Sequence, residues 1–385
     1  MTFRRSAPAA IIVAVVVVIA GVTFASSRLF GGLTAAVETG QFQLMQAIVE
    51  RALRGAGDDA LSRAEIVTAL PTTRQAVAAK DRERLLAEYA AMFAGQKERH
   101  GVDQAQFHVL PATSLLRLQD PATFGDDLTP FRPIVVAVNR EKAARKGLAI
   151  ARNGPAIFGV APVTDMQGQH VGSFEFGLEF APLLDGLKAS YGLDFTVFME
   201  EKRLREFARG LNPAVLSEQN RVGRFIRFHT TNGTLAKALA SDADLSSVAE
   251  PTHYVRGALG LPYGVLLMPL VDGAGEPLGV MMATSDFSGS RAASGRALVW
   301  QICIAVFAIV LLAGITLVVI RGFLLRPLEV LQHRAGALAA GERKGMVEPT
   351  DKFSKEIDNL AGYLEKIAKP AETKPAETKP AESKP

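Results

Sequence analysis

The chain has 385 residues, of which 48% are hydrophobic and 21% charged, so it is long enough for more than one domain with a buried core. Its formal net charge of +4 is small, because 43 basic residues are scattered among 39 acidic ones, and this argues against nucleic acid as a partner. The single cysteine, Cys303, excludes a disulfide framework and a multi-cysteine metal site.

Two uncharged runs are expected to span a membrane. The first extends from Ala7 to Ala25 behind two arginines, and the second extends from Leu298 to Ile320 and is followed at once by Arg321. Each run is long enough for an apolar helix to cross a hydrocarbon core of ~30 Å. Because basic residues beside a span stay on the cytoplasmic side, both chain ends are predicted inside and residues 28–296 outside.

The first run has an alternative interpretation as a cleaved signal peptide. It has a basic start, an apolar centre and small residues near Ala25 and Ser26, which are typical of such a peptide. Either interpretation leaves the same middle region outside the cytoplasm.

The outer region is predicted to begin with helices and continue with strands. Between Gly31 and Gly101 the apolar residues recur at helical spacing, as at Leu44, Ile48 and Leu53, and the first helix is expected to continue from the membrane as a stalk. After Gly101 the pattern changes to short alternating runs with Gly and Pro between them, which predicts strands.

A repeat divides this outer region. PVTDMQGQHVGSF, from Pro162 to Phe174, matches PLVDGAGEPLGVM, from Pro269 to Met281. The positions in register are Pro162, Asp165, Gly168 and Gly172 against Pro269, Asp272, Gly275 and Gly279. Each segment predicts a β-hairpin whose turn glycine has positive φ, unless turn-forming residues coincide by chance. We therefore expect two α+β modules in succession, each an antiparallel sheet with helices.

Three stretches of the outer region resemble the double Cache sensory domain of methyl-accepting chemotaxis proteins and sensor kinases. They are GVDQAQFHVLPATSLLRL from Gly101, FGDDLTPFR from Phe124 and VGSFEFGLEF from Val171. The resemblance is strongest over about 100–180 and extends through 290. It implies two PAS-like modules stacked on a long helix, with a small molecule bound against the sheet of one module, usually the membrane-distal one.

The segment after the second run resembles a HAMP domain, the helical module that follows the last span in such receptors. Pro327 matches its characteristic proline. Apolar residues then recur at spacings of three and four, namely Leu328, Leu331, Ala335 and Leu338, and later Ile357, Leu360, Leu364 and Ile367. The resemblance implies a parallel four-helix bundle shared by two subunits, hence a homodimer. Asp358 stands where the family usually has Gly, and an amphipathic helix pair near the membrane is the alternative.

The predicted organisation follows from these features. It comprises a cytoplasmic segment (1–6), a first span (7–27), a stalk and first Cache module (28–182), a second Cache module (183–296), a second span (297–320), a HAMP-like module (321–368) and a disordered PAETK-repeat tail (369–385). No kinase or cyclase sequence is recognisable, so the signal is expected to pass to a separate kinase or chemoreceptor partner in the cytoplasm.

The strand after Gly101 is the first candidate for a ligand site. Alternation places Gln104, Gln106 and His108 on one face. Arginine is the side chain best shaped to bind a carboxylate, so the polar face and the basic residues nearby favour an anionic or amide-bearing ligand. The candidate set is Gln106, His108, Ser114, Arg117, Arg132, Arg152 and Glu175. The alternative for each is a structural or solvated role. The resemblance to the double Cache domain implies that Pro111, Phe124, Gly125, Asp126 and Asp127 shape the loop over the pocket and stabilise the fold.

Catalytic motifs are missing from the sequence. The six histidines have no metal-ligand spacing, and there is no phosphate-binding loop and no Gly-x-Ser-x-Gly elbow. We therefore expect neither an enzyme nor a metal nor a cofactor. The sequence predicts a sensory receptor of the bacterial inner membrane for a small ligand. The alternative is a membrane scaffold that keeps a receptor body and binds a partner through its tail.

Overall fold

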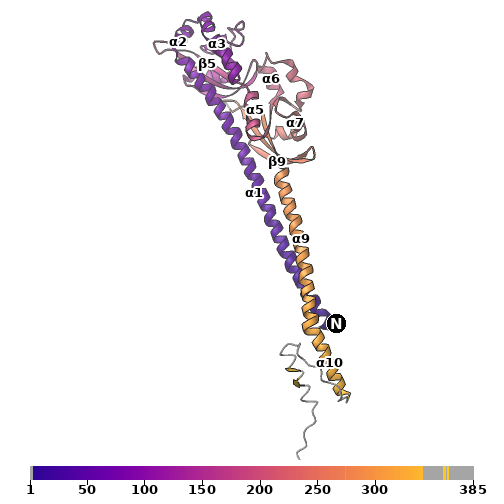
Figure 1. Ribbon diagram of the computed structural model, residues 1–385. Coiled ribbons are helices and arrows are strands. Elements are labelled where there is room, and N and C mark those ends of the chain that lie inside the picture. The colour runs from indigo at the N-terminus through magenta and orange to yellow at the C-terminus, as the bar shows by residue number, and fades with distance from the viewer. Residues whose placement is uncertain (1–2, 274, 341–358, 361, 364–385) are drawn as a thin grey trace, which may run out of the picture. The chain divides into compact units, whose positions relative to one another are not determined.

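The computed structural model describes residues 3–273, 275–340, 359–360 and 362–363. It divides into two compact units (Figure 1). One comprises residues 33–293, and the other comprises the residues before 33 and after 293. The first helix, α1 (Phe3–Ala69), contributes to both units.

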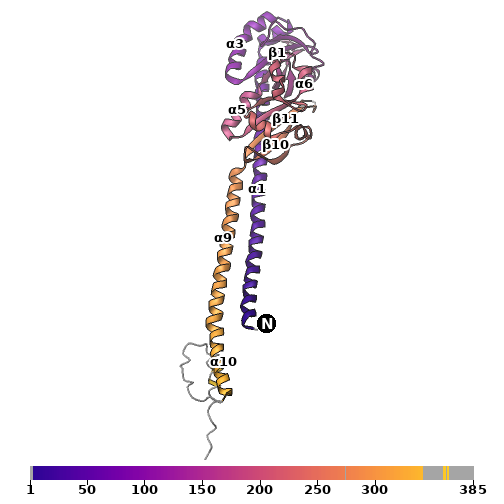
Figure 2. The same ribbon diagram turned by 90° about the vertical axis from the view of Figure 1, so that its right-hand side faces the viewer.

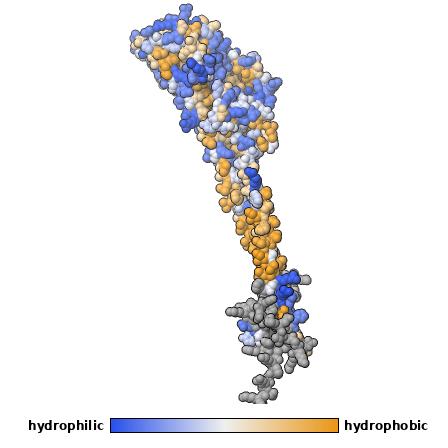
Figure 3. Space-filling view, in the orientation of Figure 1, coloured by the Kyte–Doolittle hydropathy of each residue, from blue (hydrophilic) through white to orange (hydrophobic). Residues whose placement is uncertain are grey.

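The smaller unit is built from apolar helices. It contains the start of α1, most of α9 (Ser288–Val319), a π-helical turn η3 (Ile320–Leu325) and α10 (Arg326–Ala339). The apolar windows of the two long helices have mean hydropathies of 2.7 and 3.1 and are 0% buried, so by length and composition both could cross a membrane. Figure 3 shows the apolar side chains gathered over these helices. Gln301 Nε2 donates a hydrogen bond of 2.9 Å to the Thr23 carbonyl.

The HAMP prediction is tested only in part. The first predicted HAMP helix coincides with α10, in which Leu331 is buried. Of the second, Ile357, Leu364 and Ile367 lie outside the described residues, as does the tail from residue 369. The HAMP pairing therefore stays a prediction.

The larger unit begins with the helices expected between Gly31 and Gly101. They are the rest of α1, α2 (Pro71–Ala78) and α3 (Arg82–His100). Figure 2 shows α1 running past the two sheets. Ala60, Ala64 and Leu85 are fully buried against the first sheet, where they pack in one cluster with Phe107 and Phe174.

The first sheet is antiparallel, with the order β2-β1-β5-β4-β3. Its strands are β1 (Val102–Val109), β2 (Thr113–Arg117), β3 (Arg145–Ala151), β4 (Gly154–Thr164) and β5 (His170–Leu178). Helix α4 (Pro133–Glu141) packs on the face opposite α1, with Ile134, Val135 and Val138 against Phe158 and Val160.

The second sheet repeats this topology, with the order β7-β8-β6-β11-β10-β9. Its strands are β6 (Asp194–Glu200), β7 (Arg221–Val222), β8 (Phe225–Thr230), β9 (Thr252–Ala258), β10 (Leu261–Val271) and β11 (Pro277–Asp286). The helices around it are α5 (Phe180–Tyr191), α6 (Glu201–Phe207), η1 (Pro213–Leu216), η2 (Glu218–Asn220), α7 (Gly233–Leu239) and α8 (Asp242–Ser246). The mixed fold with antiparallel sheets confirms the α+β prediction.

The repeated residues have the same structural roles in both sheets. Gly168 and Gly275 have φ of +83° and +87°, and the N–H of each donates to the carbonyl of the Asp three residues earlier. The second glycine of each pair lies against a neighbouring strand. A Cβ on Gly172 would stand 2.0 Å from the His108 carbonyl oxygen, and one on Gly279 would stand 2.1 Å from that of Phe198. No side chain fits at either position.

The two sheets share one hydrophobic core. Ile150 and Ile157 of the first sheet pack in the same cluster as Phe195 and Met199 of the second, together with Phe42 of α1. The sheets therefore belong to one compact unit, although each has its own hairpin framework. The predicted boundary between residues 182 and 183 lies within α5 and stays a prediction.

Gly159 sets the distance between α1 and the first sheet. A Cβ there would lie 2.0 Å from the Leu61 backbone nitrogen, so neither the strand nor the helix can yield without a backbone shift. We predict that Gly159→Ala costs about 1–3 kcal/mol of unfolding free energy through overpacking, measured by thermal unfolding of the full chain in detergent.

Gly147→Ala is the matched control, because a Cβ there would meet no atom closer than 3.8 Å. Equal stability of the two variants would show that α1 does not pack this closely on β4.

Candidate functional site

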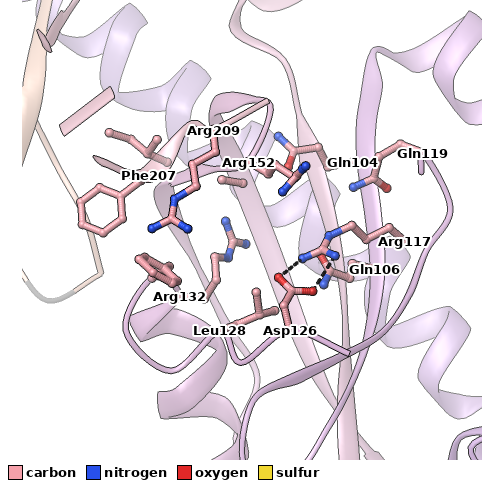
Figure 4. Close-up of a pocket in the computed structure, with 13 residues that line it drawn as sticks. Gln104, Gln106, Arg117, Gln119, Asp126, Leu128, Arg132, Arg152, Phe207 and Arg209 are labelled. Atoms are coloured by element: carbon pink, nitrogen blue, oxygen red, sulfur yellow. Dashed lines mark hydrogen bonds and ion pairs between the residues drawn. The ribbon is translucent and has the colours of Figure 1, made fainter. Parts of the chain in front are cut away.

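A cavity of about 80 Å³ lies on the α4 side of the first sheet. Strands β1, β2 and β3 form one wall, the loop between β2 and α4 forms another, and residues at the end of α6 complete the lining. Figure 4 shows the side chains around it. The volume exceeds that of a single buried water and suits a small ligand.

The polar side chains of β1 point to the α4 side of the sheet, where the cavity lies. Gln104, Gln106 and His108 are buried, while Phe107 between them packs in the opposite core. Gln106 Nε2 donates a hydrogen bond of 2.8 Å to Ser114 Oγ on β2. The alternation of β1 therefore supplies part of a buried polar surface, which Ser114 and Arg117 of β2 and Glu175 of β5 extend.

Arg117 and Asp126 join β2 to the loop that follows it. Arg117 Nη1 and Nη2 donate to the two Asp126 carboxylate oxygens at 2.8 and 2.7 Å. The Arg117 guanidinium holds the pKa of Asp126 below its usual range. The loop is fixed beside it, because the Ser114 N–H donates to the Asp126 carbonyl and the Gly125 N–H donates to the Ser114 carbonyl. Gly125 permits this turn with a φ of +81°.

Arg132 and Glu175 form a buried ion pair. Their side chains are only 4% and 2% exposed, and Arg132 Nη2 donates to Glu175 Oε2. The Arg132 guanidinium also lies 4.1 Å from the Phe158 ring centroid. Its Nε and Nη1 atoms are buried without a hydrogen-bond partner among the described residues. Arg132 lines the cavity, so the N–H groups of these two nitrogens are candidates to bind a ligand acceptor.

His108 lies behind this pair rather than in the cavity lining. Its Nε2 is 3.8 Å from Glu175 Oε1, and its Nδ1 is 3.3 Å from Ser173 Oγ. Burial lowers the pKa of His108 to about 4, Glu175 opposes this, and Arg132 and Arg117 lower it further. The imidazole is therefore neutral at pH 7.

The cavity carries an excess of positive charge. Arg117, Arg132, Arg152 and Arg209 line it, while Asp126 and the adjacent Glu175 are the carboxylates paired there. Figure 4 shows the guanidinium groups of Arg132, Arg152 and Arg209 around one space. Arginine forks in a partly enclosed site favour a carboxylate or another oxyanion.

The structure brings the seven candidate residues together in two layers. Gln106, Arg117, Arg132 and Arg152 line the cavity. Ser114 and Glu175 each contact a lining residue, and His108 lies one contact further away, beside Glu175. Of the predicted loop residues, Asp126 reaches the cavity, and Phe124 lies outside it under the Arg82 guanidinium.

Sequence reasoning missed several lining residues. Leu128, Phe131, Ile150 and Gln119 come from the same segments, and no pattern marked them. Phe207 and Arg209 come from the second module. No signal near them could have indicated the cavity, because their position depends on how the two modules pack.

No metal site accompanies the cavity. In the part of the chain that the structure describes, no group of three or more His, Cys, Asp or Glu residues could hold a metal ion.

Residues 41–224 match a double Cache family model, described as the double sensory domain of two-component sensor kinases. This family is a ligand-binding, non-catalytic module. Together with the two apolar helices, the match indicates a membrane protein with an extracytoplasmic sensor domain. Among curated proteins, none gives a significant match.

Several solved structures are similar at low identity. An extracellular ligand-binding receptor from Desulfohalobium retbaense is 12% identical with a TM-score of 0.35, covering 64% of this chain and 39% of that chain. The sensory domain of the Campylobacter jejuni chemoreceptor Tlp3 with isoleucine bound is 10% identical with a TM-score of 0.40, covering 68% and 95%. The sensor domain of the Vibrio cholerae histidine kinase DctB is 8% identical with a TM-score of 0.36, covering 64% and 98%. With TM-scores this low, the assignment rests on the family model.

The neutral buried His108 makes stability depend on pH. Its pKa rises from about 4 in the folded chain to about 6.5 on unfolding, so the unfolded state binds the extra proton between these values. The stabilisation is complete above pH 6.5 and is lost as the pH falls to 4. We predict that His108→Gln removes up to about 3 kcal/mol of pH-dependent unfolding free energy over this window.

Thermal unfolding of the full chain between pH 4 and 7 measures this effect. His100→Gln, at an exposed position at the end of α3, is the control. If His108→Gln and the wild type lose stability in parallel, the imidazole is not buried as a neutral group.

Proposed function

Because residues 41–224 match the double Cache sensory family model, we propose that the chain is a transmembrane receptor for a small carboxylate. Its outer region binds this ligand, and the conformational signal passes through the membrane to a cytoplasmic kinase or chemotaxis partner. One observation carries the choice of ligand, namely the buried Arg132 guanidinium with two N–H donors unpaired beside a positively charged cavity.

The charge arrangement supports a carboxylate over a neutral ligand. Arg117 and Arg132 each have a carboxylate partner already, but the exposed Arg152 has no ion pair in the described structure. A ligand carboxylate between Arg132 and Arg152 would satisfy the free donors of both. A neutral ligand would leave the excess positive charge uncompensated.

The path to the membrane starts at the end of β11. Phe287 is fully buried, its N–H donates 2.9 Å to the Pro262 carbonyl, and its ring centroid is 5.1 Å from that of Phe42 on α1. Arg291 on α9 then bonds the Glu38 carboxylate of α1 at 2.7 and 3.1 Å. These contacts support transmission of a conformational change, because they connect the second sheet to α1 and α9, the two helices that lead toward the spans.

The receptor is proposed to act as a homodimer. Within residues 33–54, α1 exposes Leu33, Val37 and Leu44 at spacings that follow a heptad, with exposed Gly40 and Ala47 between and after them. An exposed apolar stripe of this kind supports pairing with a second copy.

Ligand binding is tested on the full chain in detergent by thermal shift with small mono- and dicarboxylates and amino acids. The melting temperature of the wild type should rise with ligand concentration, because a ligand that binds the folded state stabilises it. Arg152→Gln and the charge-conserving Arg132→Lys should each weaken binding about tenfold or more, since each removes a charge-assisted or bidentate contact.

Arg140→Gln is the control, because Arg140 is exposed on α4 outside the cavity and pairs only with Glu141 among the described residues. A wild-type chain that no carboxylate stabilises, or a loss of binding as large in Arg140→Gln, would count against the proposed site.

The membrane topology is proposed with both termini in the cytoplasm and residues 28–296 outside. Alkaline phosphatase, which is active only outside the cytoplasm, should be active when fused after Ala293 and inactive when fused to the C-terminus. The reverse pattern would invert the topology, and a mature chain lacking the first run would identify a cleaved signal peptide.

The cytoplasmic partner separates the receptor from the scaffold alternative. Crosslinking and pulldown from membranes should recover a histidine kinase or a chemotaxis array. Recovery of a structural complex in place of either would favour the scaffold.

A further inference from the structure

The end of α6 lies over the cavity of the other module. Helix α6 follows β6 of the second sheet and ends at Phe207. Even so, Phe207 and Arg209 line the cavity whose other lining residues all belong to the first module. Figure 4 shows Arg209 on the side of the cavity opposite Arg117, with its guanidinium turned toward Arg132. We call residues 207–211 the bridging segment.

Besides apolar packing, the bridging segment makes one hydrogen bond and two ring contacts to the first module. The Gly210 N–H donates a hydrogen bond of 2.8 Å to the Arg152 carbonyl. The Phe207 and Phe131 rings meet edge to face with centroids 6.1 Å apart, and the Arg209 guanidinium lies 4.9 Å from the Phe131 centroid. These contacts are local and partly exposed, so each is of modest strength.

The same segment is joined to the second module through α6. Leu204 and Ala208 are buried in the shared core, which contains Phe195 and Met199 of β6 as well as Ile150 and Ile157 of the first sheet. Strand β6 pairs with β11, which ends at Asp286, two residues before α9 begins. A displacement of the bridging segment therefore acts on strands that lead directly to the second apolar helix.

Arg209 has no ion-pair partner in the described part of the chain, and its side chain is exposed at the cavity mouth. With Arg132 and Arg152 nearby, its charge opposes closure of the bridging segment while the cavity is empty. A bound oxyanion attracts all three guanidinium groups, so it replaces the repulsion between Arg209 and the other two arginines with a net attraction toward the ligand.

From this geometry we infer that the bridging segment is a ligand-dependent latch between the two modules. An oxyanion held by Arg132 and Arg152 in the first module is bound on its other side by Arg209 of the second module. The ligand thus draws residues 207–211 onto the first module, and its binding energy is shared between the modules. This inference rests on the proposed function and adds its coupling mechanism.

The test uses the full chain in detergent, with succinate and inorganic phosphate as probes and chloride at equal ionic strength as the reference. Calorimetry measures affinity, and hydrogen–deuterium exchange measures protection of residues 207–211. In the wild type, a bound anion should slow exchange in this segment, including the Gly210 amide. Arg209→Gln should bind the anion about tenfold more weakly and lose this protection even at saturation.

Arg205→Gln is the matched control, because Arg205 lies on α6 just before the bridging segment, pairs with Glu201 and does not line the cavity. It should keep the affinity and the protection of the wild type.

The outcomes separate the latch from the proposed function. Full protection of residues 207–211 in saturated Arg209→Gln overturns the latch, whether or not affinity falls, and leaves the receptor proposal intact. Binding of phosphate but not succinate, with the expected loss in Arg209→Gln, supports the latch and overturns the carboxylate as ligand class. A wild-type chain that binds neither anion overturns both.

Discussion

The buried ion pair between Arg132 and Glu175 is the constraint on which the site depends. Burying either charge without the other would cost several kcal/mol of folding free energy. Because Glu175 is buried on β5, the loop that carries Arg132 has to place the guanidinium beside it. Pro133 starts α4 directly after Arg132 and fixes the direction in which the chain leaves. The pair uses one nitrogen of the guanidinium, and the other two, which have no partner among the described residues, are the basis of the proposed ligand site.

The repeat explains why this site occurs in the first module. Because Gly172 and Gly279 occupy equivalent positions, β5 aligns with β11 and β1 with β6, which places Phe198 and Met282 where the first sheet has His108 and Glu175. In the second module this face is an apolar core covered by α7 and α8. The same framework thus holds a charged cavity in one copy and a packed apolar core in the other.

The parts of this arrangement that the sequence predicted are those set by local chemistry. The turn glycines, the helices before Gly101 and the alternation of β1 each depend on a few neighbouring residues. The candidates that line the cavity are set by the strand register and by the path of the loop before α4. Arg117 and Arg132 therefore line it, while His108 and Glu175 lie behind it. The contribution of Arg209 could not be predicted, because it arises from the packing of two modules whose sequences show no sign of the contact.

A ligand can shift a conformational equilibrium only by the difference in its affinity for the two states. In the proposed latch, a ligand that touched the first module alone would bind equally well whether or not the bridging segment was closed, so it would not bias the position of that segment. Contact with Arg209 would make affinity depend on that position. In this proposal, the part of the binding energy that comes from Arg209 sets how strongly the ligand favours the closed position of the bridging segment, and hence the signal that this segment can pass through β11 to α9.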